Sequence, residues 1–193
     1  MNKIILSLLL LMPFSSLLAD VDVNNLAKKK QTPQGLYMTA KDAYDAKMAD
    51  PKASLFLDVR TRAEVEFVGM ADTVDANIPY MTHDKDSWNE KKSRFNSEPN
   101  SNFSIAVEEQ LKKKGLSKQD KIIVMCRSGS RSAKAANLLS QLGYNNVYSV
   151  VDGFEGDKAK SGPNKGHRVV NGWKNANLPW SYKLTVAKMY IEE

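Results

Sequence analysis

The sequence of 193 residues is poor in side chains that cross-link a fold or bind metals, with one cysteine and two histidines. With a single cysteine no disulfide can form within the chain, so the hydrophobic core must stabilise the fold unaided. His83 and His167 lie in polar segments that contain no second histidine or cysteine. Structural and catalytic zinc sites need several such ligands together. We therefore expect no metal and no other cofactor.

Long hydrophobic runs are also missing. The apolar stretch from Ile4 to Met12 is too short to span a bilayer comfortably. Lys3 precedes this stretch and Ala19 follows it after a short segment, which is the layout of a secretory signal peptide. We expect residues 1–19 to be this signal, with export to a bacterial periplasm and no membrane insertion after cleavage. An uncleaved N-terminal anchor is the alternative interpretation.

The chain is basic, with a formal net charge of +6 at pH 7. Much of the excess lies in two lysine runs, residues 28–30 and residues 112–114. Neither run is interleaved with aromatic residues, so both are interpreted as solvated faces and not as nucleic-acid sites. A basic surface does favour the capture of small anions.

The chain is organised as one domain with appendages. Segments with helix and strand patterns alternate, and two strands are short, mostly apolar runs, "SLFLDV" and "KIIVM". Apolar strands flanked by helices predict an α/β fold, with a central parallel sheet and helices on both faces. The expected divisions are a linker or flexible arm at 20–34, the domain at 35–182 with polar insertions at 82–102 and 157–171, and a C-terminal tail at 183–193.

Helix signals accompany these strands. Thr39 and Asp42 form a capping-box pattern that predicts a helix through about Ala49. Further helices are expected over residues 61–69, 102–114 and 132–142, each followed by or ending at a glycine.

The single cysteine lies in the loop "CRSGSRS", residues 126–132, between the second apolar strand and a helix. In parallel α/β sheets ligands bind at the carboxyl ends of the strands. Loop N–H groups above the helix N-terminus, with Arg127 and Arg131, would stabilise a Cys126 thiolate, and Gly129 would allow the loop to curl. These features predict a nucleophile in an anion-binding pocket.

This loop resembles the active-site loop of rhodanese-type sulfurtransferases. Other segments resemble that family in the same order, namely "LDVRTRAEVEF", "ANIPY", "AANLLSQLGYNNVYSVVDGFEG" and "GWKNANLPW". The resemblance covers about Gly35 to Trp180. It implies a rhodanese-like fold and a sulfurtransferase that works through a Cys126 persulfide, with thiosulfate or a similar small anion as donor and a thiol or protein as acceptor.

Loop length separates this chemistry from phosphate hydrolysis. Cysteine phosphatases on a related scaffold need Cys-x5-Arg, whereas Cys126 to Arg131 is Cys-x4-Arg. Met125 also stands where such phosphatases have histidine. The shorter loop favours sulfur transfer. Two alternatives stay open: a non-enzymatic persulfide carrier or protein-binding module, and with less support a cysteine phosphatase or arsenate reductase.

The resemblance also implies roles for individual residues. Cys126 is the nucleophile, Arg127 and Arg131 bind the donor, and backbone N–H groups of the loop cradle the sulfur, those of Ser128, Gly129 and Ser130. An alternative role for Arg131 is to orient the loop by pairing with a carboxylate.

Four further residues are expected to support the site without touching the substrate: Asp58, Arg60, Glu64 and Ser132. Arg60 and Glu64 are four residues apart and are expected to pair with each other across a helical turn. For the insertion at 82–102, a lid over the site and a disordered surface loop both remain open.

Overall fold

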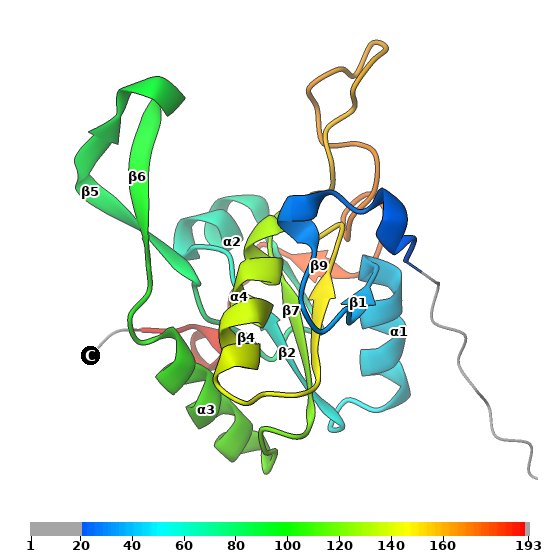
Figure 1. Cartoon of the computed structure of the whole chain (residues 1–193), viewed down its shortest axis with the longest axis vertical. Coiled ribbons are helices and arrows are strands. Elements are labelled where there is room, and N and C mark those ends of the chain that lie inside the picture. The colour runs from blue at the N-terminus through cyan, green and yellow to red at the C-terminus, as the bar shows by residue number, and fades with distance from the viewer. Residues whose placement is uncertain (1–20, 192–193) are drawn as a thin grey trace, which may run out of the picture.

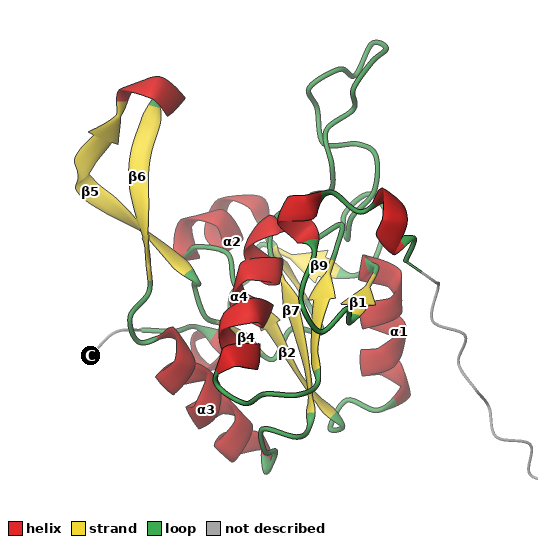
Figure 2. Cartoon of the chain, viewed as in Figure 1, coloured by secondary structure: helices red, strands yellow, loops and turns green. Residues whose placement is uncertain are grey.

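The structure of the protein is a computed structural model that describes residues 21–191, apart from the side chains of residues 84 and 85. The expected signal peptide at 1–19 therefore lies outside the described residues. Figures 1 and 2 show a layered domain from which two long segments project. Its main strands are β1 (Tyr37–Met38), β2 (Ser54–Asp58), β4 (Ala76–Asn77), β7 (Lys121–Met125) and β8 (Val147–Val150). Its helices are α1 (Ala40–Ala49), α2 (Arg62–Val68), α3 (Phe103–Lys114) and α4 (Ser130–Gln141).

The central sheet has the strand order β1-β8-β7-β2-β4, and all its pairs are parallel. In the middle, β2 and β7 pair from Ser54 opposite Lys121 to Asp58 opposite Met125. The two strands therefore end together, and Cys126 follows directly after this edge. The predicted α/β fold with a central parallel sheet is confirmed.

Helices cover both faces of the sheet. Leu55 and Leu57 of β2 face a core that includes Val107 of α3 and Leu139 of α4. The intervening Phe56 faces a second core shared with α1 and α2. Side chains of a strand alternate between faces, so a run of consecutive apolar residues such as Leu55–Leu57 is the pattern expected when both faces are buried.

Local signals fix the ends of the helices. Thr39 and Asp42 form the predicted capping box of α1, and Thr61 and Glu64 form a second one at the start of α2. The helix after the cysteine begins at Ser130, two residues before the predicted start.

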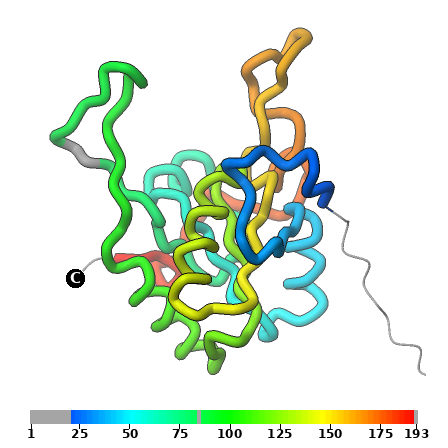
Figure 3. The backbone as a smooth tube through the Cα atoms, in the orientation of Figure 1, coloured from blue at the N-terminus to red at the C-terminus, as the bar shows by residue number. Residues whose placement is uncertain are grey.

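The prediction that residues 82–102 form a loop is wrong, because most of this segment forms a β-hairpin. Strand β5 (Met81–Asn89) pairs antiparallel with β6 (Arg94–Pro99), and the 3₁₀ helix η3 (Glu90–Lys92) joins them. Trp88 and Phe95 pack edge to face near its tip, 5.2 Å between ring centroids, and both are about half exposed. The second insertion, 157–171, is irregular, and both segments project from the same end of the domain (Figure 3).

The N-terminal arm is packed against the domain. It contains two 3₁₀ helices, η1 (Val23–Asn25) and η2 (Lys28–Lys30). Lys30 is buried and its ammonium lies 2.8 and 2.7 Å from the two carboxylate oxygens of Asp157. The expectation that the whole run at 28–30 is solvated is therefore wrong at Lys30, because a lysine with a carboxylate partner can be buried.

Short elements close the C-terminal part. Strand β9 (Trp180–Ser181) pairs antiparallel with β3 (Met70–Ala71). After the 3₁₀ helix η4 (Val186–Lys188), the N–H of Tyr190 donates to the carbonyl of Asn77 at 2.9 Å. Among the described residues no helix is both long and apolar enough to cross a membrane.

Candidate active site

Cys126 follows β7 and is only 2% exposed. The backbone N–H of Gly129 donates to its Sγ at 3.2 Å. The thiol in turn donates to the hydroxyl oxygen of Ser132, 3.6 Å away. Ser132 is buried and is held by its own hydrogen bond to the carbonyl of Gly129 at 2.9 Å. The loop thus curls around the sulfur, as expected from its position between strand and helix, and Ser132 braces that curl.

The conformation of the loop depends on Gly129. Its φ is +93°, and a Cβ atom at this position would lie 2.2 Å from the carbonyl oxygen of Val151. The segment after β8 also holds the loop from the other side, because the N–H of Phe154 donates to the carbonyl of Cys126 at 2.8 Å. At position 129 there is therefore no room for a side chain between the cysteine loop and the segment that follows β8.

Asp58 and Arg60 form a buried ion pair at the end of β2. Both side chains are fully buried, and Nη2 of Arg60 lies 2.6 Å from Oδ2 of Asp58. The guanidinium also donates to the carbonyl of Gly69 at 2.8 Å and lies 4.0 Å from the ring centre of Phe154. This pair is structural, and the predicted pairing of Arg60 with Glu64 is wrong.

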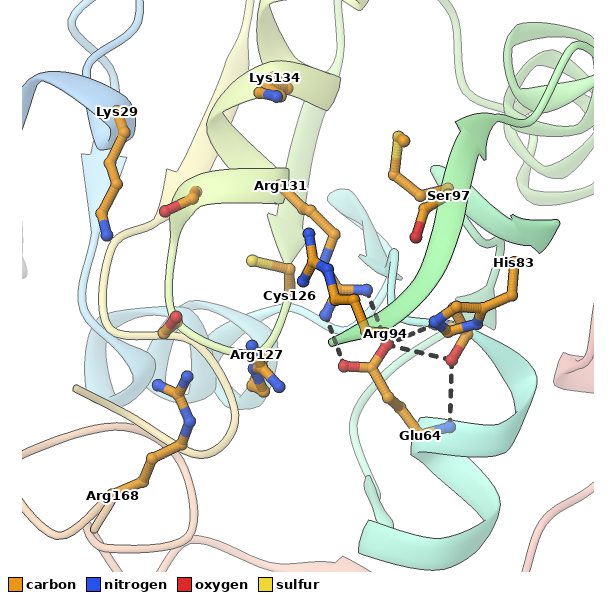
Figure 4. Close-up of a pocket in the computed structure, with 14 residues that line it drawn as sticks. Lys29, Glu64, His83, Arg94, Ser97, Cys126, Arg127, Arg131, Lys134 and Arg168 are labelled. Atoms are coloured by element: carbon orange, nitrogen blue, oxygen red, sulfur yellow. Dashed lines mark hydrogen bonds and ion pairs between the residues drawn. The ribbon is translucent and has the colours of Figure 1, made fainter. Parts of the chain in front are cut away.

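Glu64 pairs with Arg131. The two guanidinium nitrogens Nη1 and Nη2 lie 2.6 and 2.5 Å from the carboxylate oxygens (Figure 4). Burial of Glu64 opposes its ionisation, but the hydrogen bonds and charge of Arg131 outweigh burial and lower the pKa of Glu64 to about 2. This is the carboxylate pairing considered as the alternative role of Arg131.

A cavity of about 430 Å³ opens above the cysteine. The loop contributes Cys126, Arg127, Ser128, Ser130 and Arg131 to its lining. Figure 4 shows these side chains together with cationic groups from other parts of the chain. The cavity therefore combines a nucleophile with positive charge at the carboxyl end of the sheet.

The sequence prediction missed five basic residues that also line this cavity: Lys29, His83, Arg94, Lys134 and Arg168. Lys134 lies three residues after Arg131 on α4, so helical spacing was a usable signal for it. The others come from the N-terminal arm, the hairpin and the 157–171 segment, and nothing in the local sequence indicates that these segments meet.

Arg168 shows how closely the cations gather. Its Nη1 donates to the carbonyl of Gly156 at 2.5 Å. Burial, and then the positive charge of Arg127, lower its pKa from the ordinary value. The charges in the cavity thus repel one another, which favours an anion between them. The described residues hold no group of three or more His, Cys, Asp or Glu suited to a metal ion.

Comparison with known proteins agrees with this geometry. The family model of the Rhodanese-like domain matches residues 39–160. The chain belongs to the rhodanese-like family. The predicted resemblance is therefore confirmed, and Cys126 with its loop lies inside the matched region of this rhodanese-like domain.

Similar proteins differ in how much is known of them. An uncharacterized protein of Rickettsia conorii is 33% identical over 140 residues, covering 72% of this chain and 92% of that protein. The thiosulfate sulfurtransferase GlpE of Tolumonas auensis is 44% identical over 41 residues, 21% of this chain and 39% of that protein. The crystal structure of Rv0390 from M. tuberculosis has a TM-score of 0.55 and 26% identity, covering 75% of this chain and 96% of that one.

Proposed function

We propose that this rhodanese-like domain is a sulfurtransferase that moves a sulfane sulfur from an anionic donor such as thiosulfate to a thiophilic acceptor. The observation that carries the proposal is the N–H of Gly129 directed at Cys126 Sγ, 3.2 Å away, beneath a cavity lined with arginines. A thiolate is stabilised by such a donor and by nearby positive charge, which makes Cys126 the nucleophile.

In the first step the Cys126 thiolate attacks the outer sulfur of thiosulfate. A bond forms between the two sulfurs, the S–S bond of thiosulfate breaks, and sulfite leaves with the electron pair. Cys126 then carries a persulfide whose terminal sulfur is anionic. The loop, the positive end of α4 and the surrounding cations stabilise this charge.

In the second step a thiolate, or cyanide in an assay, attacks the terminal sulfur. The new bond takes that sulfur away and the Cys126 thiolate leaves, which restores the starting state. A small thiol and a cysteine of a partner protein are both chemically competent acceptors. Because Cys126 is only 2% exposed, either acceptor must reach it through the cavity.

The two loop arginines have different roles in this proposal. Arg131 gives both of its terminal nitrogens to Glu64, so it mainly holds the loop on α2. Arg127 is exposed and lines the cavity, which suits it to bind the oxygens of the donor. Arginine binds such oxyanions with paired N–H donors.

The test is thiosulfate:cyanide transfer by the wild type and by Cys126→Ser. Thiocyanate should form with the wild type and not with the variant. Thiocyanate formed at the same rate by both proteins would exclude Cys126 as the nucleophile. A wild type that accepts sulfur from thiosulfate but does not turn over with cyanide would instead be a persulfide carrier.

We also propose that the protein is exported to a bacterial periplasm. The support is the signal-peptide pattern of residues 1–19. The N-terminal residue of the protein isolated from the periplasmic fraction tests this proposal. Asp20 or a residue close to it is expected, and Met1 on the mature protein would contradict cleavage.

A further inference from the structure

The cavity is much larger than thiosulfate, an anion of five atoms. Its volume of about 430 Å³ lies within the range of roughly 300–1,000 Å³ typical of sites for whole organic ligands. A compact donor bound at Cys126 would leave most of this space to water. The size of the cavity therefore indicates a longer ligand.

The charge of the cavity also exceeds what thiosulfate requires. Six cationic side chains line it, Lys29, Arg94, Arg127, Arg131, Lys134 and Arg168. Among the described residues that line it, Glu64 is the one carboxylate, and it is already paired with Arg131. Positive charge concentrated in a cleft attracts a multivalent anion.

The cations lie on two sides of the nucleophile. Figure 4 shows Lys29 and Arg168 on one side of Cys126, and Arg94 with His83 on the other. The first pair comes from η2 and the 157–171 segment, and the second pair from the hairpin. This arrangement suits a ligand with a negative group at each end and its reactive sulfur between them.

The lining offers little to a hydrocarbon group. Apart from Cys126, Met81 is the one apolar side chain among the described residues that line the cavity. Ligands with a carbon skeleton are usually held by several apolar or aromatic walls. The lining therefore favours a ligand made of sulfur and charged oxygens along its whole length.

We infer that the donor is an extended polythionate dianion, a chain of sulfane sulfurs with a sulfonate group at each end. This inference rests on the proposed function, since it names the donor for the same Cys126 chemistry. Lys29 and Arg168 bind one sulfonate, and Arg94 binds the other. Arg127, next to the nucleophile, contacts the sulfonate oxygens that lie nearer to Cys126.

With tetrathionate the step balances without another reactant. The Cys126 thiolate attacks one inner sulfur, and a bond forms between it and Sγ. The bond between the two inner sulfurs breaks, and thiosulfate leaves with the electron pair. Cys126 is oxidised to a disulfide-level adduct that carries one S–SO₃⁻ group, and the departing sulfur is reduced. The acceptor thiolate then attacks the sulfane sulfur of this adduct, its bond to Sγ breaks, and the Cys126 thiolate leaves with the electron pair, so the S–SO₃⁻ group passes to the acceptor.

The experiment measures the rate at which Cys126 reacts with tetrathionate, by intact-protein mass spectrometry of the full chain. Cys126 should gain one S₂O₃ unit. The same rate is measured with methyl methanethiosulfonate, a small neutral reagent for thiols, and the ratio of the two rate constants is compared among variants. Lys29→Met and Arg94→Met remove one cation from each side, and Lys113→Met, exposed on α3 and outside the cavity, is the matched control.

We expect each cavity variant to lower the ratio roughly five- to tenfold, as the loss of one charge-assisted contact to a bound anion does. The control should leave the ratio unchanged. The inference would be overturned if the ratio is unchanged in both cavity variants, including the case in which the reactions with tetrathionate and with the neutral reagent slow by the same factor. Persulfide formation from thiosulfate is measured separately on the same wild-type protein, so a failure of the proposed function is distinguished from a failure of this inference.

Discussion

The guanidinium of Arg131 donates one hydrogen bond to each carboxylate oxygen of Glu64, at 2.6 and 2.5 Å, across 67 positions of sequence. This pair joins the first turn of α4 to the first turn of α2. Glu64 also accepts the N–H of Thr61 at 3.0 Å, so the same carboxylate caps α2 and holds the cysteine loop. The loop is therefore positioned by a residue that makes no contact with the sulfur.

Removal of this charge tests the role of the pair. Glu64→Gln should lower thiosulfate:cyanide transfer roughly tenfold, because Arg131 loses its ionic partner and the loop loses its anchor, a cost of one to a few kcal/mol. Glu66→Gln, exposed on the same helix, is the matched control and should retain wild-type transfer. Equal transfer by both variants would show that the pair does not position the loop.

The pH dependence of stability gives a second measure of Glu64. Its pKa of about 2 lies below the ordinary 4.5, so its contribution to stability is complete above pH 4.5 and is lost as the pH falls toward 2. The contribution amounts to about 3 kcal/mol at most. Urea unfolding should show the stability difference between wild type and Glu64→Gln shrinking over this window, whereas a constant difference would contradict the assigned pKa.

Asp152 should show the opposite pH dependence. It is buried and accepts the N–H groups of Ala40 at 2.8 Å and Gly172 at 3.2 Å. Burial raises the pKa of Asp152 to about 6 against the effect of these hydrogen bonds. Stability that depends on its protonated form is present below its ordinary pKa of 3.8 and is lost as the pH rises through 6.

The Asp152→Asn variant cannot ionise at this position. Relative to the wild type, it should gain up to about 3 kcal/mol in unfolding free energy between pH 4 and pH 7. Urea unfolding of both proteins at the two pH values measures the change. If the difference between them stays the same at both pH values, Asp152 does not titrate as assigned.

Gly129→Ala should abolish the curl of the cysteine loop. The added Cβ would meet the carbonyl oxygen of Val151 at 2.2 Å, and the φ of +93° is unfavourable for any side chain. The matched control is Gly162→Ala, at φ +74° with no atom within 4 Å of the added Cβ. Both variants incur the backbone cost of roughly 1 kcal/mol, so any further loss in Gly129→Ala measures the clash.

Persulfide formation should also differ between the Gly129→Ala and Gly162→Ala variants. Gly129→Ala should lose most of its capacity to accept sulfur from thiosulfate, because the N–H at 3.2 Å from Sγ is displaced. Gly162→Ala should accept sulfur like the wild type. Comparable stability and sulfur uptake in the two variants would contradict the role given to Gly129.

Lys30→Met should weaken the attachment of the N-terminal arm to the 157–171 segment beside the cavity. The ion pair with Asp157 ties the N-terminal arm, which carries Lys29, to the segment that carries Arg168. The Lys30 side chain is 8% exposed and that of Asp157 39%, so the loss of stability should be about 1–2 kcal/mol, less than for a fully buried pair. The KM for the anionic donor should rise more than kcat falls, since the displaced groups bind the donor.

Lys28→Met, an exposed member of the same lysine run, is the control for Lys30→Met. Steady-state kinetics gives KM and kcat for the two variants, and urea unfolding gives their free energies of unfolding. If Lys30→Met behaves like Lys28→Met in both measurements, the arm does not contribute to the site.

The helices and the central strands could be predicted because their signals are local. The runs "SLFLDV" and "KIIVM" are apolar on both faces, and both are buried strands. The capping pattern of Thr39 and Asp42 is likewise contained in four residues, and it begins α1 as predicted. The loop around Cys126 followed from its place between such a strand and a helix.

The segments that complete the cavity could not be predicted in this way. In the hairpin, Trp88 and Phe95 are half exposed and contact each other, so no buried face produces an alternating pattern. A run of three lysines gives no sign that its last member is buried against Asp157. The choice of Arg131 over Arg60 as the partner of Glu64 likewise depends on how the helices pack on the sheet.

The most direct test of the central claim is intact-protein mass spectrometry after treatment with thiosulfate. The wild type should gain the mass of one sulfur atom, located on the peptide that contains Cys126, and should lose it when cyanide is added. Cys126→Ser should gain none. A wild-type protein that takes up no sulfur, particularly one that hydrolyses an aryl phosphate instead, would contradict the account.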